Sequence, residues 1–307
     1  MSIKVAVAGA TGNLGIPVVK AILTADYPVT VLTRKGSGSI SKLPQSPNIS
    51  VVQVDYSSAT SLTEALKGHA VLISTLASAV NTGSGAGQIA LVDAAIAAGV
   101  ERYIPSEFGS DTTNPNTSQL PVFKDKVETL KHLEAAVAAN PSFSYTILYN
   151  GSFFDWGLAH STLVDPRHHT ATLFDGGDIP ISVTNLDTVG QAVVGILKHL
   201  SETANRRLYI QDAQVSQNQL IRYAKEKDGV EWTVTHKSTE KTKEESYAEL
   251  AKGANANPFV AMFGFINVSV FGGDYGGDFS SRLDNHLLGL KGLGEGEIRK
   301  QLEEHLP

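Results

Sequence analysis

The segment Gly9-Ala10-Thr11-Gly12-Asn13-Leu14-Gly15 lies between the first apolar run of the chain and a helical pattern. Its G-x-x-G-x-x-G spacing, in this strand-to-helix context, is typical of a turn that holds a dinucleotide pyrophosphate, and an ordinary glycine turn is the alternative. Glycine permits the turn, lets phosphate approach bare backbone, and lets the helix pack closely on the strand. We therefore expect cofactor contacts from Gly9, Thr11, Gly12, Asn13, Leu14 and Gly15.

Short apolar runs alternate with helical patterns through the first half of the chain, which is typical of βαβ units. Strands are expected at residues 3–8, 29–32, 50–54, 70–74, 102–105 and 145–149, and helices at 14–24, 62–67, 88–98 and 123–139. We predict an α/β protein with a Rossmann-type, doubly wound parallel sheet over residues 1–150. A smaller C-terminal α/β substrate lobe is expected over residues 151–307, partly returning to the Rossmann sheet.

In the second half of the chain, apolar runs and helical patterns alternate less regularly. Helices are expected at residues 185–200, 217–227, 240–252 and 297–304, and strands at 207–210 and 232–235. We predict no helix or strand for the glycine-rich aromatic stretch at residues 271–279.

Composition narrows the classes of function. The 307 residues are 42% hydrophobic and 18% charged, as in a folded globular protein, and the net charge of −6 disfavours nucleic acid as a partner. The chain contains no cysteine, which excludes disulfides and thiolate chemistry. The N-terminus shows no basic leader or long apolar run, so we expect no signal peptide, no membrane partner and a cytoplasmic location. We expect a monomer or a homodimer.

The residues after the second strand indicate which dinucleotide binds. Arg34 and Lys35 stand there, and no carboxylate does. An arginine at this place suits the 2′-phosphate of NADP(H), whereas a carboxylate would favour NAD. A solvated Arg-Lys pair in a loop is the alternative. Asp55 ends the third strand, either near the adenine or as a plain turn aspartate, and Thr75 and Asn150 follow later strands and join the expected cofactor site.

The run Arg102-Tyr103-Ile104-Pro105-Ser106-Glu107-Phe108-Gly109 follows the helix expected at residues 88–98. Together with the glycine turn and Arg34, it closely resembles the isoflavone reductase-like members of the atypical short-chain dehydrogenase/reductase group, which also contains the NmrA-like proteins. The resemblance covers residues 1–160 well, and the second half resembles fungal NmrA-like sequences only loosely. It implies a Rossmann fold, NADP(H) as cofactor, and reductase activity.

The resemblance also implies a catalytic lysine. In the plant reductases it lies in a segment like Phe-Ile-Asp-Lys, before a helix that ends Ile-Glu-Ala-Ala. This chain has Phe123-Lys124-Asp125-Lys126 and then Leu133-Glu134-Ala135-Ala136, and the gap-free match selects Lys126.

Helical geometry gives a separate argument for the same lysine. The helix at residues 123–139 carries an apolar stripe formed by Phe123, Val127, Leu130, Leu133 and Val137. Lys126 falls about 40° from the centre of this stripe and Lys124 about 120° away. Lys126 should therefore point toward the protein body, where burial would lower its pKa and suit it to proton transfer. A lysine whose stem packs on the helix flank while its amine reaches solvent is the alternative, and Glu134 also lies near the stripe.

The expected substrate pocket departs from the plant pattern. The sixth strand leads into Tyr149-Asn150-Gly151-Ser152-Phe153-Phe154-Asp155-Trp156, which keeps an asparagine in changed surroundings. Its aromatic side chains suit a flat hydrophobic substrate, and burial in the core is the alternative. The pocket residues expected here are Glu107, Phe108, Phe153, Phe154 and Trp156.

Other chemical signals are weaker. The spacing Tyr-x-x-x-Lys occurs at Tyr223 and Lys227, far beyond the dinucleotide half. His168 and His169 are adjacent and lack a carboxylate at ligand spacing, so no metal site is expected. No Gly-x-Ser-x-Gly elbow marks a serine hydrolase.

The predicted function is an NADPH-dependent reductase. A hydride would reach an activated C=C, benzylic or carbonyl carbon of a hydrophobic, ring-bearing small molecule, with Lys126 donating or relaying the proton. The main alternative is an NmrA-like redox sensor that binds NADP(H) without turnover, which a surface-exposed Lys126 would favour. A nucleotide-sugar epimerase is disfavoured because Tyr-x-x-x-Lys is not in its expected place.

Overall fold

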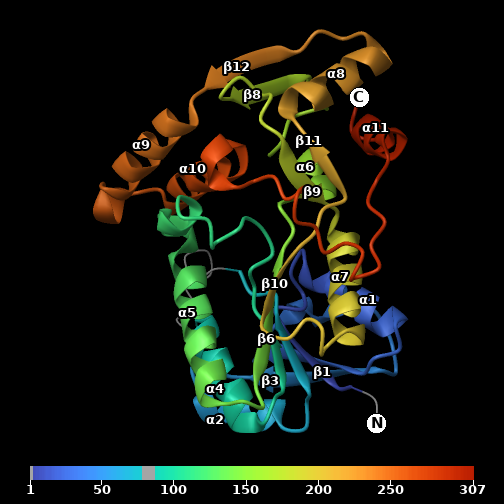
Figure 1. The fold of residues 1–307 in the computed structure, drawn as a ribbon, viewed down its shortest axis with the longest axis vertical. Coiled ribbons are helices and arrows are strands. Elements are labelled where there is room, and N and C mark those ends of the chain that lie inside the picture. The colour runs from blue at the N-terminus through green and yellow to red at the C-terminus, as the bar shows by residue number, and fades with distance from the viewer. Residues whose placement is uncertain (1–2, 78–86) are drawn as a thin grey trace.

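The computed structural model describes residues 3–77 and 87–307. Its centre is a seven-stranded sheet in the order β10-β6-β5-β4-β1-β2-β3, with every pairing parallel (Figure 1). The strands are β1 (Val5–Ala8), β2 (Val29–Arg34), β3 (Ile49–Val54), β4 (Val71–Ser74), β5 (Arg102–Ile104), β6 (Ser144–Tyr149) and β10 (Arg206–Tyr209). The strand order reverses direction between β1 and β4, which confirms the doubly wound prediction.

Helices cover both faces of this sheet. The helices α1 (Gly15–Thr24) and α7 (Leu186–Lys198) pack together on one face, and α2 (Ala59–Leu66), α4 (Gln88–Ala98) and α5 (Lys124–Ala139) lie on the other (Figure 1). Successive residues of β1 face opposite sides, so Val5 and Val7 belong to one apolar core and Ala6 and Ala8 to the other. Burial on both faces explains why the central strand β1 is apolar throughout.

The second half of the chain adds one strand and one helix to the Rossmann unit. β10 pairs with β6 in parallel, with Arg206 opposite Thr146, and α7 packs against α1. Buried Arg102 at the start of β5 joins these parts. Its guanidinium donates hydrogen bonds to the Thr146 hydroxyl of β6 (2.9 Å) and, in the second half, to the Thr203 hydroxyl (3.1 Å) and the Leu200 carbonyl (2.5 Å).

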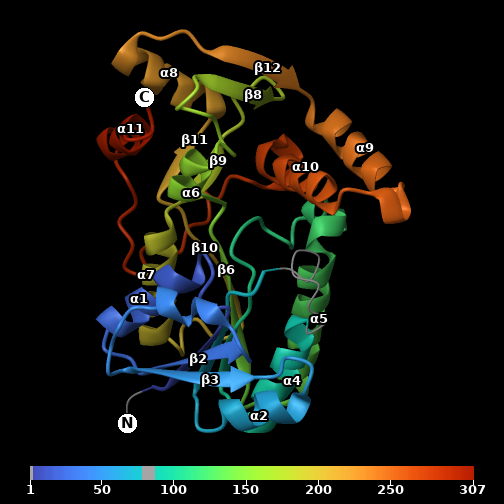
Figure 2. The same cartoon turned by 180° about the vertical axis from the view of Figure 1, so that it is seen from behind.

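A smaller lobe lies beyond the carboxyl ends of the strands (Figure 2). It contains the sheet β11-β9-β7 and the parallel pair β12-β8. Its elements are β7 (Ser152–Phe153), α6 (Phe154–Ala159), β8 (Thr170–Phe174), β9 (Ile181–Thr184), β11 (Ala213–Val215), α8 (Gln217–Asp228), β12 (Thr233–Lys237) and α11 (Glu295–Glu303). Phe154, Leu173, Leu220 and Trp232 contribute to its own apolar core.

The helices α9 (Thr239–Leu250) and α10 (Pro258–Phe271) pack together beside this lobe, with α10 over the start of α5 (Figures 1 and 2). The Asn257 carboxamide oxygen accepts a hydrogen bond from the Phe259 amide (3.1 Å), and Pro258 occupies the first turn. The sequence prediction contains no helix at α10. The segment is apolar on all sides and lacks the polar face that marks an amphipathic helix.

Several other elements were not predicted: β7, α6, β8, β9 and β11. They are two to six residues long and lie in the half of the chain where the alternation of apolar runs is irregular. Over residues 3–77 and 87–307, no helix is long and apolar enough to cross a bilayer.

Candidate active site

The glycine turn lies where β1 and β4 end side by side. Gly9 has a φ of +80°, and a Cβ built on it would lie 2.7 Å from the carbonyl carbon of Thr75. The Gly12 amide donates a hydrogen bond to the Gly9 carbonyl (3.0 Å), which closes the turn. Gly15 packs against the same carbonyl, and a Cβ there would overlap it. The backbone of the turn is therefore bare and closely packed, as phosphate binding at a helix N-terminus requires.

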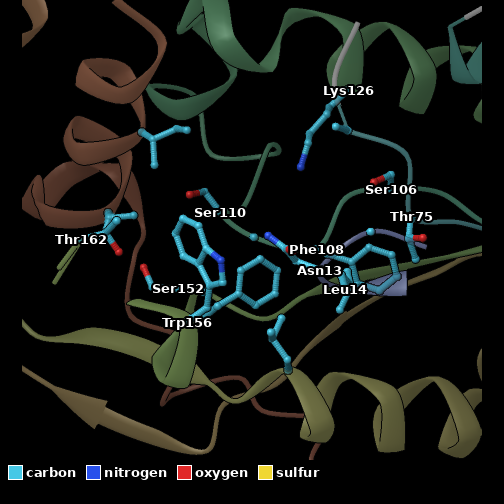
Figure 3. A pocket seen from close by; sticks show the side chains of 18 of the residues that line it. Asn13, Leu14, Thr75, Ser106, Phe108, Ser110, Lys126, Ser152, Trp156 and Thr162 are labelled. Atoms are coloured by element: carbon cyan, nitrogen blue, oxygen red, sulfur yellow. The ribbon is translucent and has the colours of Figure 1, made fainter. Parts of the chain in front are cut away.

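A cavity of about 610 Å³ opens above this turn, between the sheet and the smaller lobe. Figure 3 shows residues from both halves of the chain around it, with Asn13, Leu14 and Thr75 near one end and Trp156 and Thr162 near the other. Of the cofactor residues predicted from sequence, the cavity is lined by Gly9, Thr11, Gly12, Asn13, Leu14, Arg34 and Thr75.

The remaining predicted cofactor residues lie elsewhere. Gly15 holds α1 against the turn instead of facing the cavity. Lys35 is exposed and does not line the cavity. Asp55 accepts hydrogen bonds from the amide (2.9 Å) and the hydroxyl (2.6 Å) of Ser57, the pattern of a turn aspartate, and does not line the cavity. Asn150 is fully buried, with its amide group donating to the Gly151 carbonyl (3.0 Å).

Lys126 projects from the first turn of α5 into the cavity (Figure 3). Its ammonium donates a hydrogen bond to the main-chain carbonyl of Glu107. Lys124, two residues earlier, is exposed and faces away, as the apolar stripe predicts. Burial lowers the pKa of Lys126, and the nearby Glu107 carboxylate opposes this effect. A lysine in this setting is suited to proton transfer.

Two side chains predicted for the pocket do not line it. Phe154 is fully buried and packs in the core of the smaller lobe, because α6 begins at this residue and turns the ring inward. Glu107 is only 1% exposed, and its carboxylate accepts a hydrogen bond from the Thr112 hydroxyl (2.9 Å) within the protein. Phe108, Phe153 and Trp156 do line the cavity, and the indole of Trp156 stacks on His160 with 4.3 Å between ring centroids.

The helix α10 forms one wall of the cavity, which the sequence did not predict. One stripe of this helix, at helical spacing, faces the cavity and is formed by Phe263, Ile266, Asn267, Val270 and Phe271. The opposite side, including Met262 and Phe265, packs on Leu120 and Phe123 just before α5. The signal was present in the cap Asn257-Pro258 and in the apolar run that follows it. Ser106, Ser110, Ser152 and Thr162 also line the cavity and add hydroxyl groups.

The weaker sequence signals have structural explanations. Tyr223 is buried in the core of the smaller lobe, while Lys227 pairs with Glu303 (2.6 Å). His168 and His169 bond separately to Asp165 and Asp228, both at 2.8 Å. Within the described ranges, no group of three or more potential ligands could hold a metal ion.

The fold and this cavity define a Rossmann-type dinucleotide-binding protein. The NmrA-like family model matches residues 1–268, and the chain belongs to this family, as the sequence resemblance predicts. Among curated proteins, Oxidoreductase aprR of Aspergillus flavus is 36% identical over 278 residues, which cover 90% of this chain and 91% of that protein.

Two solved structures with the same fold contain an NADP cofactor. The binary complex of leucoanthocyanidin reductase with NADPH from Vitis vinifera superposes with a TM-score of 0.72 at 18% identity, covering 98% of this chain and 99% of that one. The structure of AtPrR2 with NADP+ and (+)-pinoresinol gives 0.73 at 20% identity, covering 100% and 99%. These likenesses establish that the architecture is shared over the whole chain.

Proposed function

We propose that this protein is an NADPH-dependent reductase of the isoflavone reductase and pinoresinol reductase type. Its family membership, and its similarity to a curated protein named as an oxidoreductase, support this class of activity. The observation that carries the proposal is that the glycine turn and Lys126 line one cavity, so a proton donor faces the space that opens above the dinucleotide turn.

The residues present fit NADP(H). A backbone turn in which a Cβ would collide leaves room for the pyrophosphate, and the N-terminus of α1 directs amide groups toward it. Arg34 ends β2, lines the cavity and would pair with the 2′-phosphate. Bound NADPH supplies the hydride. Residues 1–150 thus form the cofactor half, and residues 151–307 provide most of the opposite wall.

The substrate is proposed to be a hydrophobic, ring-bearing small molecule. Phe108, Phe153 and Trp156 offer aromatic faces, and the α10 stripe adds aliphatic contacts. The reacting carbon, in an activated C=C, a benzylic position or a carbonyl, would gain the hydride while Lys126 delivers the matching proton. Lys126 thereby becomes a neutral amine and recovers a proton from solvent before the next cycle.

A redox sensor without turnover is the competing function for this fold. That function needs the glycine turn but no proton donor in the cavity. The cavity-facing orientation of Lys126 favours the reductase.

The test is NADPH oxidation, followed by the loss of near-ultraviolet absorbance, against isoflavones, benzylic ethers, enones and quinones. Turnover of at least one ring-bearing compound, with product reduced at a single carbon or double bond, is the expected result. Tight NADPH binding with no turnover of any compound would contradict the reductase and favour the sensor.

A further inference from the structure

Glu107 lies in the loop after β5, beside the cavity that Lys126 enters. We propose that Glu107 is a positioning residue for Lys126: its main-chain carbonyl fixes the ammonium in the cavity, and its buried carboxylate compensates the ammonium charge. This inference rests on the role proposed above for Lys126. It concerns how the chain keeps a proton on that amine.

The position of Lys126 makes such compensation necessary. Lys126 is the third residue of α5, in the first turn, where the unpaired amides and the helix dipole present positive charge. An ammonium there is disfavoured, and partial burial removes much of the water that would stabilise it. Its one hydrogen bond within the described residues goes to the neutral Glu107 carbonyl, which orients the ammonium but carries no negative charge.

The Glu107 carboxylate, in turn, is buried without enough hydrogen bonds to stabilise its negative charge. It is 1% exposed, and only one of its oxygens has a partner, the Thr112 hydroxyl at 2.9 Å. The other oxygen, Oε1, is buried with no hydrogen-bond partner in the described part of the chain. A buried carboxylate in this state is costly unless a cation compensates it. Burial raises the pKa of Glu107, and the nearby Lys126 charge opposes that rise.

The other ionisable groups around Glu107 do not supply a positive charge that could compensate its carboxylate in place of Lys126. Asp111 is negative, and its charge is already compensated by Arg282 at 2.9 Å. Tyr149 bonds to Thr112 at 2.9 Å, and Tyr103 lies on β5. Burial raises the pKa of both phenols above the usual value, so they stay neutral at working pH. We therefore assign the positive charge of Lys126 as the one that compensates the negative charge of Glu107.

The two contributions of Glu107 can be separated experimentally. Glu107→Gln keeps the main-chain carbonyl, the side-chain shape and an acceptor for Thr112, but it removes the negative charge. The matched control is Glu134→Gln. It also replaces a glutamate by glutamine, but at an exposed carboxylate on α5 that pairs with Arg207. Orientation of Lys126 is therefore preserved in both variants, and only Glu107→Gln removes the compensating charge.

The measurement is an NMR titration of ¹³C-labelled lysine in the full-length protein with NADP+ bound. The Lys126 signal is identified by its absence in Lys126→Met. In Glu107→Gln, the proton affinity of Lys126 should fall about tenfold or more. In Glu134→Gln, it should match the wild type. Equal Lys126 titration in the wild type and Glu107→Gln would overturn the proposal.

A second variant keeps the test decisive if Glu107→Gln does not fold. Thr112→Val removes the hydroxyl that stabilises the ionised carboxylate, so Lys126 should lose proton affinity in the same direction by a smaller factor. An unchanged Lys126 titration in a folded Thr112→Val protein would also overturn the proposal. The titration needs no substrate, so a failure to find turnover would contradict the reductase function while this inference is judged on the Lys126 signal alone.

Discussion

Gly9 and Thr75 lie against each other at the ends of adjacent strands, so that a Cβ on residue 9 would sit 2.7 Å from the Thr75 carbonyl carbon. Gly9→Ala therefore introduces both a clash and an unfavourable φ of +80°. We expect it to destabilise the protein by about 2 kcal/mol or more and to weaken NADPH binding at least about tenfold. Thermal unfolding and fluorescence titration with NADPH would measure the two effects.

The matched control for this change is Gly99→Ala. Gly99 has the same φ of +80°, but a Cβ there meets nothing within 4 Å. Gly99→Ala should lower the free energy of unfolding only through the unfavourable backbone angle and should leave NADPH affinity unchanged. Equal NADPH affinity in Gly9→Ala and the wild type would show that the turn does not approach the cofactor.

Arg34 should determine the choice between NADPH and NADH. Arg34 and its neighbour Lys35 are both exposed, but only Arg34 lines the cavity. Arg34→Ala removes the charge-assisted pair with the 2′-phosphate and should weaken NADPH binding about tenfold to a hundredfold, with NADH affinity unchanged. Lys35→Ala should alter neither. Titration calorimetry with both dinucleotides checks this, and an equal loss for NADPH and NADH would refute the 2′-phosphate contact.

The α10 wall should determine how well a substrate fits. Ile266→Trp places a large ring into the cavity, and we expect the KM for a ring-bearing substrate to rise about tenfold or more while NADPH affinity stays within about twofold. Phe259→Trp serves as the control, because Phe259 lies on the same helix but is 57% exposed and outside the cavity. An unchanged KM in Ile266→Trp would place the substrate elsewhere.

Proton donation by Lys126 predicts a pH limit on turnover. The amine must be protonated to donate, so kcat should fall as the pH rises through the pKa of Lys126. Burial lowers that pKa below its usual value of 10.5, so the loss should begin at lower pH than for an exposed lysine. A pH profile of kcat at saturating NADPH measures this limit. Turnover that is flat up to the pKa of an ordinary lysine would argue against Lys126 as the donor.

Strong periodic signals explain why the Rossmann half could be predicted. The alternation of apolar strands and helices located β1 to β6, and the glycine turn identified the end of the sheet at which the cavity lies. The apolar stripe of α5 correctly separated the cavity-facing Lys126 from the exposed Lys124. These features are local, because each depends on residues within one element and its neighbour.

The other wall of the site could not be predicted in the same way. Phe153 lines the cavity and Phe154 enters the core, a difference set by where α6 begins and not by residue type. Glu107 turns inward, where the Thr112 hydroxyl donates a hydrogen bond to its carboxylate, a contact that no periodicity reveals. The helix α10 is apolar on both sides because it packs on Phe123 and also faces the cavity, and this tertiary role removes its amphipathic signal.

The most direct test of the central claim compares Lys126→Met with Lys124→Met in single-turnover reduction of a ring-bearing substrate by bound NADPH. Both variants remove one lysine from the first turn of α5, but only Lys126 lines the cavity. We predict that Lys126→Met slows reduction at least about a hundredfold with NADPH affinity preserved, and that Lys124→Met behaves as the wild type. Reduction by Lys126→Met at the wild-type rate would contradict the account.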